Sequence, residues 1–257
     1  MRADSGPVWS ALPGGSFTVV GMPGTGSDAD FARRAFGPAC AARGVAFVAV
    51  EPDPRAVVAS YRAALDAAAR TGPVLAAGIS LGAAVAVEWV IDNPDTAVGV
   101  IAALPAWTGA DTAGCPATLS AAVTAAALRA EGLDPVLARM RAGSPAWLAE
   151  ALTQSWTALW PDLPAALEEV AGYAWPSPET LAALRVPATV VTAVDDPVHP
   201  HTVAGDWAAR IPDCVVHRIT LAELGSDPSV LGERGFSRSG SGYPQVEEAG
   251  KRKRASA

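Results

Sequence analysis

Two kinds of hydrophobic pattern alternate along the chain from residue 16 to about residue 221. Short continuous apolar runs are separated by longer stretches in which apolar residues recur at helical spacing. This alternation is typical of a parallel sheet built from strand–helix–strand units, with the strands buried on both faces. Strands are predicted at residues 16–20, 45–50, 74–77, 98–104, 188–194 and 215–221.

Helices are predicted between the first four strands. The first begins near residue 28, where Ser27 followed by Asp30 resembles a capping box. The second covers about residues 55–70. The third begins directly after Ser80 and ends before Pro94, which cannot continue a helix.

The strand pattern stops between residues 105 and about 175, where helical stretches follow one another. A helical segment inserted between two strands of a sheet is typical of a cap over a site. A stripe at i, i+4 spacing runs through it, formed by Leu148, Leu152, Trp156 and Trp160. Two interpretations are open: the stripe packs the cap onto the sheet, or part of it lines an apolar substrate pocket.

The chain length of 257 residues fits one α/β domain. We assign residues 1–233 to this domain, with the helical cap at about 105–175. Residues 234–257 are rich in Gly, Ser, Lys and Arg and have no periodic apolar face. This composition predicts a disordered basic tail.

Composition and charge argue against several kinds of function. A net charge of −7 argues against a nucleic-acid surface. No apolar run approaches the roughly 20 residues of a membrane-spanning helix, and the first residues lack a signal-peptide core, so a cytoplasmic protein is expected. The three cysteines (Cys40, Cys115, Cys214) include no CxxC pair, which argues against a disulfide framework or a zinc site. No cofactor or metal is expected.

The strongest candidate for chemistry is the pattern GxSxG at residues 78–82, between a predicted strand and a predicted helix. A serine in a tight strand-to-helix turn projects its hydroxyl above the sheet edge. Neighbours without a Cβ, here Gly78 and Gly82, let strand and helix approach each other. Ser80 is therefore the candidate nucleophile, and the N–H of Leu81, at the positive end of the helix, is a candidate oxyanion donor.

With this motif the chain resembles the α/β-hydrolase family over roughly residues 16–221. The loop at residues 20–24 is similar to the family's HGxPG loop, although Val20 stands where the histidine usually does. By that resemblance, Met22 would supply a second oxyanion N–H. The fold implied is a mostly parallel sheet flanked by helices, with the helical cap as an insertion.

The segment after the predicted strand at 188–194 is similar to the family's acid loop. Asp196 corresponds to the acid that orients the catalytic histidine, with Asp195 as the second choice. A purely structural interpretation also remains, because adjacent Asp residues often cap a turn before a helix.

The family's histidine follows the last strand, and here Ser226 or Asp227 stands in that place. The family's usual final helix is also not evident after Leu231. His217 lies within a predicted strand, which leaves His199 as the candidate base and His201 as a weaker one. A histidine three residues from its acid is expected to have little freedom to contact both Asp196 and the serine.

The function expected is a serine hydrolase acting on an ester or thioester of a small to medium apolar acyl substrate. A small molecule is the only partner expected, and the oligomeric state is left open. The alternative is a catalytically degenerate member of the fold that binds a small molecule or a partner, because one fold hosts many functions.

Overall fold

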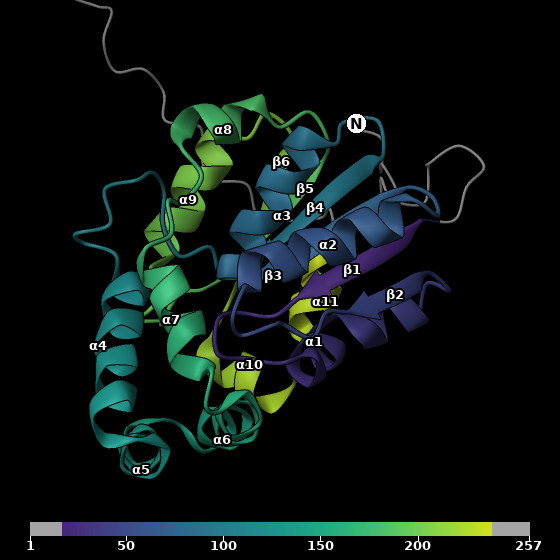
Figure 1. The fold of residues 1–257 in the computed structure, drawn as a ribbon. Helices are drawn as coiled ribbons and strands as arrows, with labels where there is room; N and C mark the ends of the chain where they lie inside the picture. Colours follow the sequence, from purple (N-terminus) through teal and green to yellow (C-terminus); the bar gives the residue numbers. More distant parts are fainter. Residues whose placement is uncertain (1–16, 238–257) are drawn as a thin grey trace, which may run out of the picture.

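A computed structural model describes residues 17–237 of the chain. Its six strands form one sheet in the order β2-β1-β3-β4-β5-β6, and all neighbouring strands are parallel (Figure 1). The six predicted strands are confirmed, with ends that shift by at most two residues. The strands are β1 (Thr18–Met22), β2 (Ala46–Ala49), β3 (Val74–Ile79), β4 (Ala97–Ala103), β5 (Ala188–Ala193) and β6 (Cys214–Ile219).

Helices cover both faces of this sheet and also form an insertion. They are α1 (Ala29–Ala41), α2 (Val57–Ala69), α3 (Leu81–Asp92), α4 (Pro116–Glu131), α5 (Leu133–Gly143), α6 (Ala146–Leu159), α7 (Leu163–Ala171), α8 (Pro178–Ala183), α9 (His201–Arg210), α10 (Leu221–Ser226) and α11 (Val230–Gly235).

Successive residues of β3 alternate between two hydrophobic cores, one on each face of the sheet. Val74 and Ala76 belong to the core that includes residues of α2, α3 and α9, whereas Leu75 and Ala77 belong to the core that includes residues of α1 and α11. All six residues of β3 are buried. This central strand therefore holds its carboxyl end, where Ser80 follows, in a rigid position.

The C-terminal part of the domain differs from the sequence-based expectation. A final helix was not evident after Leu231, but α11 spans this residue and packs against α1, β4 and β5. The helix α10 also follows β6. Residues 234–237, which the composition assigned to the tail, belong to the described structure: Gly235 ends α11 and Phe236 is 1% exposed. Arg43 lies over the Phe236 ring, 4.6 Å from its centroid. The rest of the tail, residues 238–257, lies outside the described residues.

The start of α1 also differs in detail, because the capping residue is Asp28 and not Ser27. The Asp28 carboxylate accepts a hydrogen bond from the N–H of Phe31 at 2.9 Å. A carboxylate accepts hydrogen bonds from N–H groups, and its negative charge is stabilised at the positive end of the helix. Both effects favour Asp28 as the capping residue.

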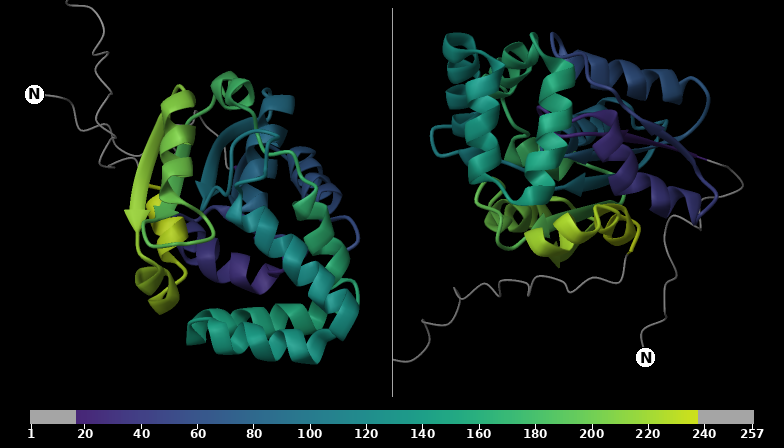
Figure 2. Two further views of the ribbon diagram at one scale, coloured as in Figure 1. Left: turned by 90° about the vertical axis from the view of Figure 1, so that its left-hand side faces the viewer. Right: turned by 90° about the horizontal axis from the view of Figure 1, so that it is seen from below.

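Helices α4 to α7 form the insertion between β4 and β5, at one end of the sheet (Figure 2). Two hydrogen bonds join α6 to the loop before α1. Gln154 Nε2 donates to Asp28 Oδ2 at 2.9 Å, and Ser155 Oγ donates to Gly26 O at 2.7 Å.

The insertion also contacts α2. Its helix α7 supplies Glu169, whose carboxylate accepts the N–H groups of Val57 and Val58 at 2.6 and 3.0 Å. Glu169 thereby caps α2, which has no side-chain cap of its own.

No helix among residues 17–237 combines the length and the apolar character that crossing a membrane requires.

Candidate active site

Ser80 occupies a strained turn between β3 and α3. Its backbone has φ 55° and ψ −113°, a conformation that non-glycine residues rarely adopt. The neighbouring glycines explain how the turn closes: a Cβ on Gly78 would lie 2.1 Å from the carbonyl of Gly82, and one on Gly82 would lie 2.7 Å from Met22 O. The sequence-based prediction of a tight strand-to-helix turn with glycine on both sides is confirmed.

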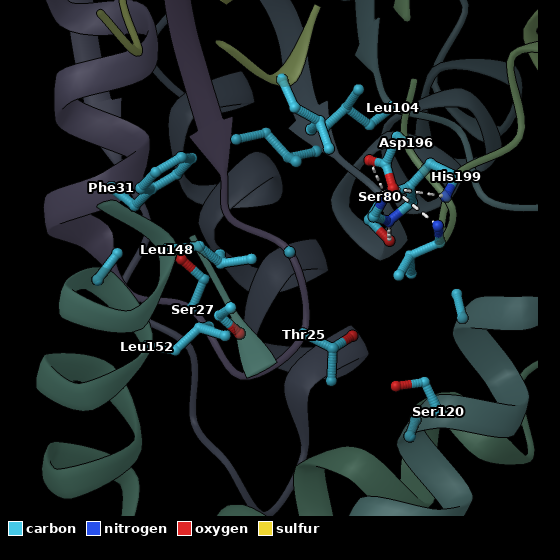
Figure 3. Close-up of a pocket in the computed structure, with 18 of the residues that line it drawn as sticks. Thr25, Ser27, Phe31, Ser80, Leu104, Ser120, Leu148, Leu152, Asp196 and His199 are labelled. Carbon is cyan, nitrogen blue, oxygen red and sulfur yellow. Dashed lines mark hydrogen bonds and ion pairs between the residues drawn. The ribbon is translucent and has the colours of Figure 1, made fainter. Parts of the chain in front are cut away.

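His199 connects Ser80 to Asp196 (Figure 3). His199 Nε2 lies 3.0 Å from Ser80 Oγ, and His199 Nδ1 lies 2.8 Å from Asp196 Oδ2. Because an ionised carboxylate only accepts hydrogen bonds, Nδ1 carries the hydrogen, and Nε2 is free to accept the proton of the serine hydroxyl. The three side chains thus have the hydrogen-bonding order of a Ser-His-Asp triad.

A histidine three residues from its acid was expected to have little freedom to contact both partners, yet His199 contacts both. Asp196 Oδ1 accepts the N–H groups of Val198 and His199 at 2.7 and 3.2 Å, which folds residues 196–199 into a tight turn. The same turn places the imidazole against Oδ2, with its Nε2 directed at Ser80. One short segment therefore brings acid and imidazole together without a contribution from the last strand.

The other residues considered as acid or base make different contacts or lie at other positions. Asp195 Oδ1 accepts the N–H of Leu221 at 2.8 Å, at the start of α10. His201 is exposed at the first position of α9. His217 is buried in β6, as expected, and its Nε2 lies 2.8 Å from Ser237 O. Ser226, one of the two residues at the family's usual histidine position, is exposed at the end of α10.

Asp196 is suited to remain ionised. Burial alone would raise its pKa, but the hydrogen bond and charge of His199 and the N–H groups of Val198 and His199 outweigh burial and lower the pKa below its ordinary value. Its side chain is 7% exposed and that of His199 is 17% exposed. The carboxylate can therefore stabilise positive charge on the imidazole.

The two candidate oxyanion donors lie on either side of the serine turn. Leu81 is the first residue of α3, and N–H groups in the first turn of a helix have no acceptor within it. Met22 ends β1, and the loop that follows it runs beside the serine: a Cβ on Gly24 would lie 3.6 Å from Ser80 Cβ. Both positions fit the expected roles, which remain predictions.

A cavity of about 430 Å³ opens onto Ser80, His199 and Asp196. Its walls come from the body of the domain and from the helical insertion, and most of its lining side chains are apolar. Asp196 and His199 are the only ionisable groups among the described residues that line it. Leu104, at the end of β4, lines it too and, like Ser80, is a non-glycine residue with positive φ (49°).

Part of the predicted apolar stripe lines the cavity and part of it does not. Leu148, Leu152 and Trp156 line the cavity, as does Trp147, whereas Trp160 does not and is 37% exposed. Sequence reasoning missed other lining residues, above all Leu221 and Leu224 of α10. The signal in the sequence is their i, i+3 spacing after the last strand.

Two of the three cysteines lie buried in the described part of the chain. Cys40 and Cys115 are buried, and burial raises the pKa of the Cys40 thiol to about 12 although Arg43 acts to lower it. No group of three His, Cys, Asp or Glu side chains within residues 17–237 is arranged to hold a metal ion.

Comparison with known proteins supports the fold. No protein-family model matches the chain, and no curated protein sequence matches it. Solved structures do: a protein from Mycobacterium tuberculosis assigned as a non-heme bromoperoxidase is 16% identical, with a TM-score of 0.64, covering 85% of this chain and 90% of that one. A hydrolase from Oleispira antarctica is 14% identical (TM-score 0.63; 80% and 84% covered). A thermophilic esterase from Thermogutta terrifontis is 17% identical (TM-score 0.61; 80% and 81% covered).

The sheet order, the serine turn and these structural neighbours define one class. The chain has the α/β-hydrolase fold. At these sequence identities the likeness shows the fold and leaves the activity to be argued from the site.

Proposed function

We propose that the protein is a serine hydrolase that cleaves an ester or thioester of a small to medium apolar acyl substrate. The observation that carries this proposal is the hydrogen-bonded chain from Ser80 Oγ through His199 to Asp196 Oδ2, at 3.0 and 2.8 Å, facing a cavity. A nucleophile and a base within hydrogen-bonding reach, with the base oriented by a third group, is the arrangement that activates a serine.

In the acylation step, His199 Nε2 takes the hydroxyl proton as Ser80 Oγ forms a bond to the substrate's carbonyl carbon. Asp196 stabilises the imidazolium, and the N–H groups of Met22 and Leu81 stabilise the negative charge on the carbonyl oxygen. The bond to the leaving alcohol or thiol then breaks, and the leaving group takes the proton from His199.

In the deacylation step, a water molecule gives its proton to His199 as its oxygen attacks the acyl carbon. The bond to Ser80 Oγ breaks, the proton returns to the serine, and the carboxylic acid leaves. One water is consumed for each ester cleaved, and the three side chains return to their starting state.

The cavity supports an uncharged acyl group. Its volume of about 430 Å³ is within the range of small-molecule sites, and no Lys, Arg or Glu is among its described lining residues. A charged group placed there would lose its hydration without gaining a partner of opposite charge. The part of the substrate that enters the cavity is therefore apolar.

Labelling with a fluorophosphonate probe tests the proposal. Wild-type protein should be labelled, Ser80→Ala should not, and Ser120→Ala, which alters an exposed serine of the same cavity, should be labelled like the wild type. Hydrolysis of p-nitrophenyl butyrate should follow the same order. Absence of labelling and hydrolysis in folded wild-type protein would contradict the proposal and favour a non-hydrolytic binding protein of the same fold.

A further inference from the structure

The cavity has two apolar sides that belong to different hydrophobic cores. One side includes Trp156, Leu167 and Val170, which pack in the core shared with α2 and α3. The other side belongs to the core shared with α1 and α11. We call this second side the α6–α10 wall, formed by Phe31, Trp147, Leu221 and Leu224.

The α6–α10 wall draws its residues from three elements that are distant in sequence. Phe31 comes from α1, Trp147 from α6, and Leu221 and Leu224 from α10. Figure 3 shows Phe31 across the cavity from Ser80 and His199. None of the four side chains of the wall is charged. A substrate group that extends from Ser80 toward the wall therefore meets apolar side chains.

Trp147 lies against α10 on this side of the cavity. A Cβ on Gly225 would lie 2.3 Å from both Cδ1 and Nε1 of Trp147, so the indole ring sits directly against the glycine backbone. Only a residue without a side chain permits this approach. Trp147 is partly exposed and lines the cavity where α6 contacts α10.

From this arrangement we infer that the α6–α10 wall binds the saturated straight hydrocarbon chain of the acyl group, and that Trp147 limits the length of that chain. This inference rests on the proposed function in one respect: the hydrocarbon chain is taken to be the acyl part of an ester. In this fold the segment after the last strand normally carries the histidine. Here His199 contacts Ser80 from the loop after β5, and the segment after β6 supplies Leu221 and Leu224 to the cavity.

The test is a chain-length profile of kcat/KM for p-nitrophenyl esters from acetate to dodecanoate. In the wild type, kcat/KM should rise by about fourfold per methylene group until the chain reaches Trp147, because each buried methylene contributes about that factor. Trp147→Ala should move the optimum to chains at least two carbons longer. Leu221→Phe, which adds volume at a partly buried position, should move it to shorter chains.

Trp160→Ala is the matched control, since it removes a second tryptophan close to α6 that does not line the cavity. Its profile should coincide with that of the wild type. Unchanged profiles in both Trp147→Ala and Leu221→Phe would overturn the inference, even if the esters are hydrolysed.

Binding without turnover separates this inference from the proposed function. Ser80→Ala protein should bind the intact esters with the same dependence on chain length, measured by quenching of tryptophan fluorescence, and Trp147→Ala in that background should bind the longer chains. If wild-type protein hydrolyses no ester but this binding pattern holds, the wall is a chain-binding site and the hydrolase proposal fails. Binding independent of chain length would overturn the inference.

Discussion

Two adjacent strands of the sheet end in segments of opposite character. After β5, Asp196 and His199 turn back on each other and form a polar pair beside Ser80. After β6, α10 presents Leu221 and Leu224 to the same cavity. A single four-residue turn can therefore supply both acid and imidazole, which leaves the segment after β6 free to form an apolar wall.

The largest effect is expected when the imidazole is moved from the segment after β5 to the segment after β6. His199→Gln should lower kcat by about a million-fold, the loss typical when a triad loses its histidine. Adding Ser226→His should not restore activity, because Ser226 is exposed at the end of α10. Recovery of kcat in the double variant, measured with p-nitrophenyl butyrate, would show that the segment after β6 can still supply the base.

Replacing the acid tests the other half of the polar pair. Asp196→Asn should lower kcat by about 10⁴-fold, because an amide that donates to Nδ1 leaves Nε2 protonated and unable to accept the serine proton. Asp195→Asn is the matched control: its side chain contacts Leu221 N–H, so kcat should stay within a few-fold of the wild type. Equal losses in the two variants would contradict the assignment of the acid.

The dependence of stability on pH tests whether the ionised Asp196 carboxylate stabilises the fold. The folded protein holds the pKa of Asp196 below its ordinary value of 3.8, so the ionised carboxylate contributes stability above about pH 4, and this contribution is lost as the pH falls through the folded-state pKa. Asp196→Asn should therefore be less stable than the wild type at pH 6 by about 1.5–3 kcal/mol. The gap between the two melting temperatures should narrow below pH 4. A constant gap from pH 6 to pH 3 would mean that the charge does not contribute.

The smallest expected effect concerns the contact that joins the two segments. Asp195→Ala removes the hydrogen bond to the Leu221 N–H and should lower the free energy of unfolding by about 1 kcal/mol. Asp206→Ala, which removes only an exposed ion pair with Arg210, should change it by less than about 0.5 kcal/mol. Urea denaturation of the two variants measures the difference, and equal values would show that the contact does not stabilise α10.

Much of the fold follows from the sequence because its determinants are local. Continuous apolar runs predicted all six strands, and the glycines at 78 and 82 predicted the strained turn at Ser80. The two helices after β6 were missed because α10 and α11 are six residues each, too short to show a convincing helical period.

The site was harder to predict because its geometry depends on backbone hydrogen bonds. The sequence identified His199 as the candidate base, but the spacing suggested that it had little freedom to contact both Asp196 and Ser80. What spacing does not show is the turn in which Asp196 Oδ1 accepts two N–H groups while Oδ2 faces the imidazole. The lining by Leu221 and Leu224 likewise arises only when α10 packs beside α6.

The most direct test of the account is the rate at which a fluorophosphonate probe labels Ser80 when each nearby histidine is replaced in turn. His199→Gln should slow labelling by at least about a thousand-fold, because the hydroxyl loses its general base. His201→Gln, which alters an exposed residue of α9, should label at the wild-type rate. Labelling of His199→Gln at the wild-type rate would contradict the claim that the turn after β5 supplies the base.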